Sequence, residues 1–192
     1  EFLRRYQDDA YAALYKGFVD QVRAAETNAE RGSTRLSEAV ARYLFKLMAY
    51  KDEYEVARLH TDPAFTQKIA AMFDGDVKLV HHLAPPLLAK RNDKGELIKR
   101  PFGPWMRTAF GWLAKMKGLR GSALDPFGKT EERRTERALI GEYRADIEQL
   151  LSGLDADPHP SVRTAVVSLL PALGPVRAVP RLAALMAGQD PA

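Results

Sequence analysis

Basic side chains gather on both sides of a turn near the middle of the chain. The stretch HLAPPLLAKRNDKGELIKRPFGPW runs from His82 to Trp105. Its centre, RNDKG, is rich in residues that accept turn geometry and lies between two short apolar runs, so we expect a β-hairpin. Cations that share a face of this hairpin repel each other unless an anion lies between them. The hairpin is therefore either an anion or interface site or a solvated turn, and its candidate residues are Lys90, Arg91, Lys99 and Arg100.

Two adjacent histidines, His81 and His82, lie on a predicted strand from Val77 to Leu83. Neighbouring strand residues point to opposite faces, so this pair cannot hold one metal ion as two histidines one helical turn apart can. His82 is the candidate for a hydrogen bond to a ligand at the strand end, and a structural or surface role is the alternative. We expect no metal site in this chain.

Two further segments are polar enough to belong to a site. Lys51, Asp52, Glu53 and Glu55 form a charge run, interpreted either as a solvated helix face, with Lys51 and Glu55 paired, or as an interface. The loop GLRGSALDPFG can bring backbone amides to a ligand, but it lacks the pattern of a phosphate-binding loop. Neither segment predicts a catalytic or cofactor-binding residue.

Charge is unevenly distributed along the 192 residues. The formal net charge is +4, yet the segment from Pro86 to Gly121 has nine basic and two acidic residues and so carries +7. Such a segment attracts anions without selecting among them. The absence of cysteine excludes disulfides, thiolate metal sites and iron–sulfur ligands in this chain. With no long apolar run and no signal peptide, we expect a soluble, cytoplasmic protein, and a first residue other than methionine suggests a fragment.

Helical periodicity predicts a mainly α fold of four or five helices with a small inserted β-hairpin or short sheet. Asp62 and Pro63 form a helix start, and Thr130 is a cap for a long helix. The helix after Pro104 carries a large aromatic face, including Trp105 and Trp112, that we expect to be buried. The predicted helices cover about residues 3–32, 36–54, 63–75, 104–118 and 131–151.

Several motifs in one order resemble a known family. They are AYKDEYEVARL, HLAPPLL, FGPWM, LRGSALDPFG and ERRTERALI, within a likeness that runs from about Tyr6 to Leu151. Together they resemble the C-terminal region of the fused bacterial indolepyruvate ferredoxin oxidoreductases. We assign residues 1–152 to such an accessory domain. We expect residues 153–192 to form a helical tail, whose sequence departs from the family pattern and is loosely similar to one HEAT-type helical pair.

The resemblance implies a role in a larger enzyme that converts indolepyruvate to indoleacetyl-CoA, CO2 and reduced ferredoxin. That parent enzyme is expected to use thiamine diphosphate, magnesium and 4Fe–4S clusters, to act as a homodimer, and to engage ferredoxin and coenzyme A. This chain lies outside the cofactor domains of the family, so we expect no cofactor and no activity in it alone. The alternative is a non-enzymatic module that uses the basic hairpin on an acidic protein surface or nucleic acid, of which we expect nucleic acid less. A membrane partner is not expected.

Overall fold

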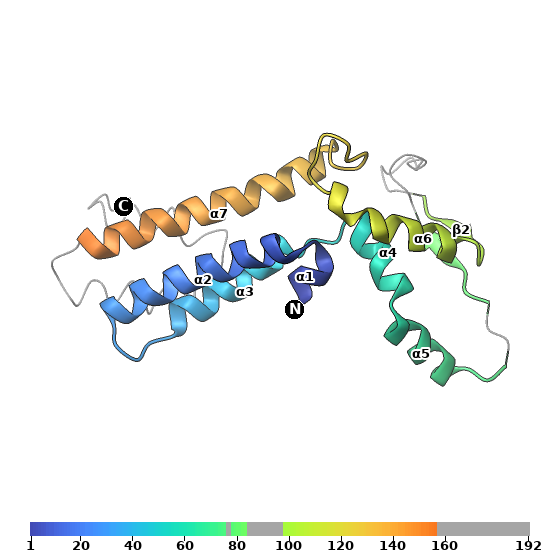
Figure 1. The fold of residues 1–192 in the computed structure, drawn as a ribbon, viewed down its shortest axis with the longest axis horizontal. Coiled ribbons are helices and arrows are strands. Elements are labelled where there is room, and N and C mark those ends of the chain that lie inside the picture. The colour runs from blue at the N-terminus through green and yellow to red at the C-terminus, as the bar shows by residue number, and fades with distance from the viewer. Residues whose placement is uncertain (76–77, 84–97, 157–192) are drawn as a thin grey trace. The chain divides into compact units, whose positions relative to one another are not determined.

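The computed structural model describes residues 1–75, 78–83 and 98–156 and shows a mainly α fold with one small antiparallel sheet, as predicted (Figure 1). The chain divides into two compact units. Unit 1 combines Glu1–Tyr50 with the chain from Arg134 onward, and unit 2 is the intervening Lys51–Arg133. Unit 2 is thus inserted between two halves of unit 1. None of the described helices combines the length and apolar character that a transmembrane span requires.

The described residues form more helices than the four or five expected. The elements in chain order are α1 (Phe2–Tyr6), α2 (Asp9–Ala29), α3 (Arg35–Met48), α4 (Glu53–Thr61), α5 (Pro63–Met72), β1 (His81–Leu83), β2 (Arg100–Phe102), α6 (Met106–Lys115), the 3₁₀ helix η1 (Met116–Leu119) and α7 (Glu131–Ala156).

Two aspartates explain why two predicted helices are each divided in the structure. Asp8 accepts a hydrogen bond from the Tyr11 amide at 2.7 Å and starts α2, so the first predicted helix becomes α1 and α2. Asp52 accepts from the Glu55 amide at 2.8 Å and starts α4, so the second predicted helix ends as α3, and its last two residues begin a further helix, α4, that continues beyond the predicted end. In both cases the apolar periodicity continues across the break, while a capping side chain satisfies the amides of a new first turn.

Unit 1 buries one face of each of its long helices in a common core. α2 and α3 pack together, as the short connection between them predicts, and α7 closes the core (Figure 1). Of the expected apolar face of α7, Ala138 and Leu139 are exposed. The guanidinium of Arg144 lies 5.0 Å from the ring centroid of Phe18 on α2. The buried core residues are Leu3, Tyr6, Phe18, Val22, Leu36, Val40, Leu44, Met48, Tyr143, Ile147, Leu150 and Leu151.

A carboxylate on α2 caps the start of α3. Glu26 is fully buried and accepts hydrogen bonds from the amides of Leu36 and Ser37, each at 2.9 Å, and from the Ser33 hydroxyl at 2.8 Å. Burial alone would raise the pKa of Glu26, but these hydrogen bonds hold the pKa below its usual range. The charge of Glu26 therefore fixes the turn between α2 and α3.

Unit 2 packs α4 against α6, with the hairpin strands alongside. Its small core consists of Ala57, Met106 and Phe110, with partly buried apolar side chains such as Leu83 and Phe102 around them. The expected small sheet is confirmed as an antiparallel pairing of β1 with β2. The apolar runs predicted to form the hairpin around RNDKG lie, except for residues 98–100, outside the described residues. The strand was expected to begin at Val77, but residues 78–80 have no regular structure because only His81–Leu83 have partners on β2.

Two helix starts were predicted correctly. Asp62 accepts a hydrogen bond from the Ala64 amide at 3.0 Å, and Pro63 occupies the first turn of α5. The Thr130 hydroxyl accepts from the Arg133 amide at 3.4 Å at the start of α7. α7 continues to Ala156, beyond the predicted end near residue 151, and the rest of the expected helical tail lies outside the described residues.

Candidate functional site

The basic hairpin is only partly covered by the described residues. Lys99 and Arg100 are exposed, and Arg100 lies opposite Leu83 in the ladder. Lys90 and Arg91 lie outside the described residues, so their convergence with Lys99 and Arg100 stays a prediction.

The two adjacent histidines point to opposite sides of the hairpin, as expected from strand geometry. His82 is exposed and pairs with Pro101, whereas His81 is 7% exposed. His82 is therefore accessible at the strand where a ligand was predicted. Among the described residues, no three histidine, aspartate or glutamate side chains converge as metal ligands.

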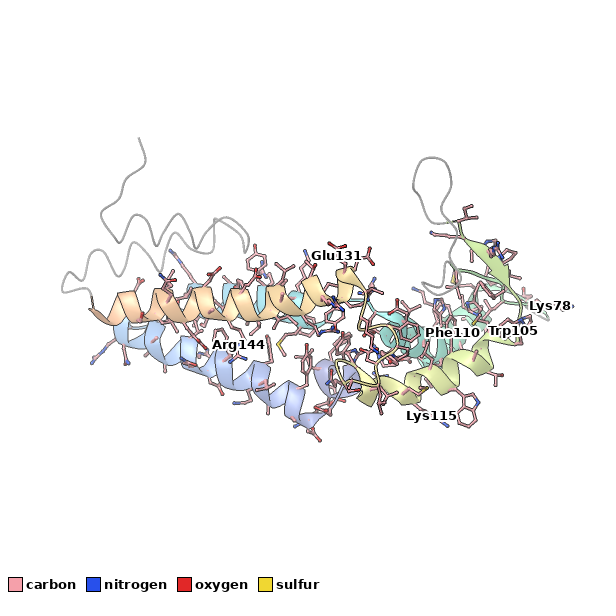
Figure 2. The ribbon with its side chains drawn as sticks, turned by 90° about the horizontal axis from the view of Figure 1, so that it is seen from above. Lys78, Trp105, Phe110, Lys115, Glu131 and Arg144 are labelled. Atoms are coloured by element: carbon pink, nitrogen blue, oxygen red, sulfur yellow. The ribbon has the colours of Figure 1, made fainter. Side chains whose placement is uncertain are left out.

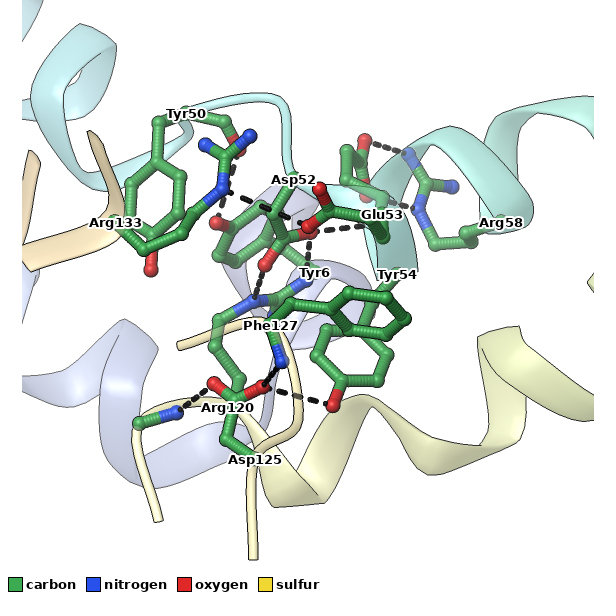
Figure 3. Close-up of polar contacts among 12 residues, drawn as sticks. Tyr6, Tyr50, Asp52, Glu53, Tyr54, Arg58, Arg120, Asp125, Phe127 and Arg133 are labelled. Atoms are coloured by element: carbon green, nitrogen blue, oxygen red, sulfur yellow. Dashed lines mark hydrogen bonds and ion pairs between the residues drawn. The ribbon is translucent and has the colours of Figure 1, made fainter. Parts of the chain in front are cut away.

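The carboxylates of the charge run from Lys51 to Glu55 belong to a buried polar cluster and not to a solvated helix face, whereas Lys51 is exposed (Figure 3). Asp52 and Glu55 are 3% and 2% exposed. Asp52 receives both Nε and an Nη of Arg120, the latter at 2.9 Å, and Arg120 is itself buried. The predicted pairing of Lys51 with Glu55 is wrong, because Lys51 precedes the start of α4 and Glu55 is held by Arg58, with contacts of 2.7 and 2.8 Å.

A second carboxylate, Asp125, organises the glycine-rich loop. Its oxygens accept hydrogen bonds from the amides of Gly121 at 2.8 Å and Phe127 at 3.1 Å, and from the Tyr54 hydroxyl at 3.1 Å (Figure 3). Burial would raise the pKa of Asp125, but the amides of Gly121, Gly128 and Phe127 and the Tyr54 hydroxyl hold it below its usual range. The amides that could have approached a ligand therefore bind a side chain of the loop itself.

The two carboxylates are joined through Tyr54 and Arg120. The guanidinium of Arg120 lies 5.5 Å from the ring centroid of Tyr54, and the Phe127 ring packs edge-on against the same ring at 5.5 Å. Burial and the neighbouring Asp125 raise the pKa of Tyr54, so its hydroxyl stays protonated and donates. These contacts together hold the 118–128 loop against α4.

Two further ion pairs extend this cluster. Arg58 also approaches Asp62 at 3.5 Å, which links α4 to the cap of α5. Glu53 lies 3.5 Å from Arg133 at the start of α7, and burial raises the pKa of Glu53 although Arg133 favours its charged form. Each pair lies within unit 2, so together they tie the ends of its elements to one another.

A pair of histidines packs beside Phe110 in unit 2. The rings of His60 and His81 are 4.9 Å apart, and each lies 5.2 Å from the Phe110 ring. Burial lowers the pKa of both imidazoles, and the neighbouring His81 lowers that of His60 further. Nδ1 of His60 is buried without a hydrogen-bond partner in the part of the chain that the structure describes. Both rings therefore act as neutral packing groups.

The expected burial of the aromatic face of α6 is wrong for its two tryptophans. Trp105 is 61% exposed and Trp112 is 69% exposed, and Met116 beside them is 43% exposed. Phe110 lies on the inner side of α6, while Lys115 projects from the opposite side (Figure 2). α6 therefore divides its large side chains between the core of unit 2 and an exposed face.

Charges in unit 2 are sorted between inside and outside. Asp52, Glu55 and Asp125 are buried, and Glu53 and Asp62 are half-buried in ion pairs. The described residues of unit 2 therefore include eight exposed cations but only three exposed anions, which are Asp74, Glu131 and Glu132. The cations are Lys51, Lys68, Lys78, Lys99, Arg100, Arg107, Lys115 and Lys129.

The sequence alone could not have assembled the polar cluster. Arg120 is 68 residues from Asp52, and Asp125 is 71 residues from Tyr54, so no local pattern joins them. One signal was present: both sides of the cluster belong to motifs, AYKDEYEVARL and LRGSALDPFG, that carry the resemblance described above.

Comparison with known proteins gives one match. Searches among curated proteins and among solved structures each found no significant match. A model of a family of unknown function, DUF6537, matches residues 1–171, which include every described helix and strand. The chain therefore belongs to the DUF6537 family.

Proposed function

We propose that this chain is the C-terminal accessory region of a thiamine diphosphate-dependent 2-oxo acid:ferredoxin oxidoreductase similar to the indolepyruvate enzymes. In this assignment, the parent enzyme converts indolepyruvate to indoleacetyl-CoA and passes electrons to ferredoxin. The accessory region supplies a folded support for the catalytic domains and holds no catalytic residue of its own.

The polar cluster of unit 2 is the observation that supports this assignment. Two of the motifs that carry the resemblance supply its two sides: Asp52 and Tyr54 come from one, and Arg120 and Asp125 from the other. Their polar groups bind one another and the loop backbone. Buried groups matched in this way rigidify a fold, whereas a catalytic site keeps reactive groups accessible to a substrate. A structural role for the region therefore accounts for the motifs.

The test compares the full-length protein with the 192-residue chain. Indolepyruvate- and coenzyme A-dependent reduction of ferredoxin is measured for both, together with thiamine diphosphate binding by calorimetry. We expect turnover from the full-length protein, and neither turnover nor thiamine diphosphate binding from the chain alone. Turnover by the chain alone contradicts the division of labour, and a full-length protein without this activity contradicts the assignment to an oxidoreductase.

The basic hairpin is tested in the same assay. Lys90, Arg91, Lys99 and Arg100 are all changed to serine in the full-length protein, and turnover is measured across coenzyme A concentrations. A raised KM for coenzyme A at unchanged thermal stability assigns the hairpin to anion binding. Unchanged kinetics and stability assign it to a solvated turn.

A further inference from the structure

A stripe of large side chains lies uncovered along α6 and its ends. Trp105, Thr108, Trp112, Lys115 and Met116 recur at i, i+3, i+7, i+10 and i+11, which places them on one side of the helix. We call this set the α6 stripe. The two tryptophans are seven residues apart, or about 10 Å along a helix. Tryptophan is a costly side chain to leave in water, so two on one stripe indicate a surface that is covered in the working protein.

The charge around the stripe indicates the chemistry of what covers it. From Ile98 to Leu119 the sequence has five basic residues and no acidic residue. The nearby carboxylates of α4 are buried or ion-paired inside unit 2, so they do not neutralise this surface. A partner that covers the α6 stripe must therefore bring the negative charge itself.

The position of Lys115 favours a protein over a nucleic acid. Its Nζ lies 5.6 Å from the ring centroid of Trp112. A partner that covers this ring face therefore also contacts the ammonium. A base stacking on that ring face would have to displace the ammonium. A protein surface can cover the indole with apolar side chains and place a carboxylate beside the ammonium. Trp and Met, both present in the α6 stripe, are also enriched in the centres of protein interfaces.

We propose that the α6 stripe docks on an acidic protein surface with an apolar centre, carried by another domain of the same full-length polypeptide. This inference rests on the accessory role proposed above, and it names the surface through which the region supports its neighbours. Trp112 is the expected hot spot of the interface because it is the more exposed tryptophan and carries the paired cation.

The test places a photo-crosslinking amino acid at Trp112 in the full-length protein. The matched control carries it at Leu14, a residue on α2 of unit 1 that is 56% exposed. After irradiation, cross-linked peptides are identified by mass spectrometry. We expect adducts from Trp112 to a peptide outside residues 1–192 of the same polypeptide that is rich in aspartate and glutamate, at a yield at least tenfold above the Leu14 control.

Other adducts overturn the inference. These are adducts to lipid, nucleic acid or a separate protein, to a peptide without acidic residues, or a yield no higher than that of the control. Lys115→Glu, which reverses the charge of an exposed side chain, should reduce the specific adduct several-fold, and Lys129→Glu should leave it unchanged. Ferredoxin reduction without the expected adduct refutes the docking surface and leaves the accessory role standing. The expected adduct in a full-length protein without turnover supports the docking surface and refutes the assignment to an oxidoreductase.

Discussion

Loss of Arg120 should destabilise unit 2 far more than loss of a surface cation. Arg120 and Asp52 are each 3% exposed, and the guanidinium makes two contacts to the carboxylate and lies over the Tyr54 ring. In Arg120→Leu, the charge of Asp52 stays buried with the Glu55 amide still donating to it. Removing one partner of a buried ion pair costs about 3–5 kcal/mol, because the remaining charge is desolvated without compensation.

The assay is chemical denaturation of the 192-residue chain followed by circular dichroism, with amide hydrogen exchange to locate the loss in α4 and α6. The control is Lys16→Met, which breaks an i, i+4 pair whose side chains are 75% and 57% exposed. This control should cost no more than about 0.5 kcal/mol. The double variant Arg120→Leu with Asp52→Asn should recover part of the loss, because asparagine still caps α4 without a buried charge.

The outcome that refutes this reasoning is a loss below about 1 kcal/mol for Arg120→Leu, the range of solvated pairs. Exchange protection that fell equally in unit 1 and unit 2 would also contradict it. In either case, the buried ion pair between Asp52 and Arg120 would not be what stabilises the packing of the glycine-rich loop against α4.

Three further predictions concern other parts of the chain. Glu26→Gln should lower the free energy of unfolding by about 1.5–3 kcal/mol in chemical denaturation, because two amides at the start of α3 then compete for one acceptor oxygen. His60 and His81 have pKa values lowered by burial, so the stability that they contribute is present above about pH 6.5 and is lost as the pH falls through their folded values. Replacing both with phenylalanine should flatten the dependence of stability on pH between about 7 and 5, and an unchanged slope would count against their burial as neutral rings. Trp105 and Trp112 are the only tryptophans in the sequence, so the fluorescence of the isolated chain should be readily quenched by acrylamide, and protected emission would contradict their exposure.

Local signals in the sequence predicted local structure well. Asp62 followed by Pro63 gave a helix start at the right residue, and the expectation of a short sheet within a mainly α fold is confirmed by β1 and β2. Apolar periodicity located the helices other than α4, most of which lies beyond the predicted end at residue 54. It also missed the breaks at Asp8 and Asp52, since an aspartate in a periodic run is equally typical of an exposed helix residue.

Signals that depend on distant partners were misread. Asp52 resembles a solvated charge until Arg120, 68 residues away, is brought beside it. The tryptophans of α6 resemble core residues because their size and spacing are those of a buried face. Whether such a face is buried within the same unit depends on the packing of α4 and α6, which no local pattern specifies.

The insertion of unit 2 within unit 1 sets the order in which the chain can fold during synthesis. The helices α2 and α3 leave the ribosome before α7, and their core lacks Tyr143, Ile147, Leu150 and Leu151 until α7 has been made. Unit 2 is continuous in sequence and can complete its contacts before the second segment of unit 1, from Arg134 onward, has been synthesised. Folding unit 2 first also converts the long loop that unit 1 must close from a free chain into a compact body, which lowers the entropy cost of that closure. The nascent α2–α3 pair is therefore the segment that most needs protection from aggregation, and a slowed unit 2 would prolong its exposure.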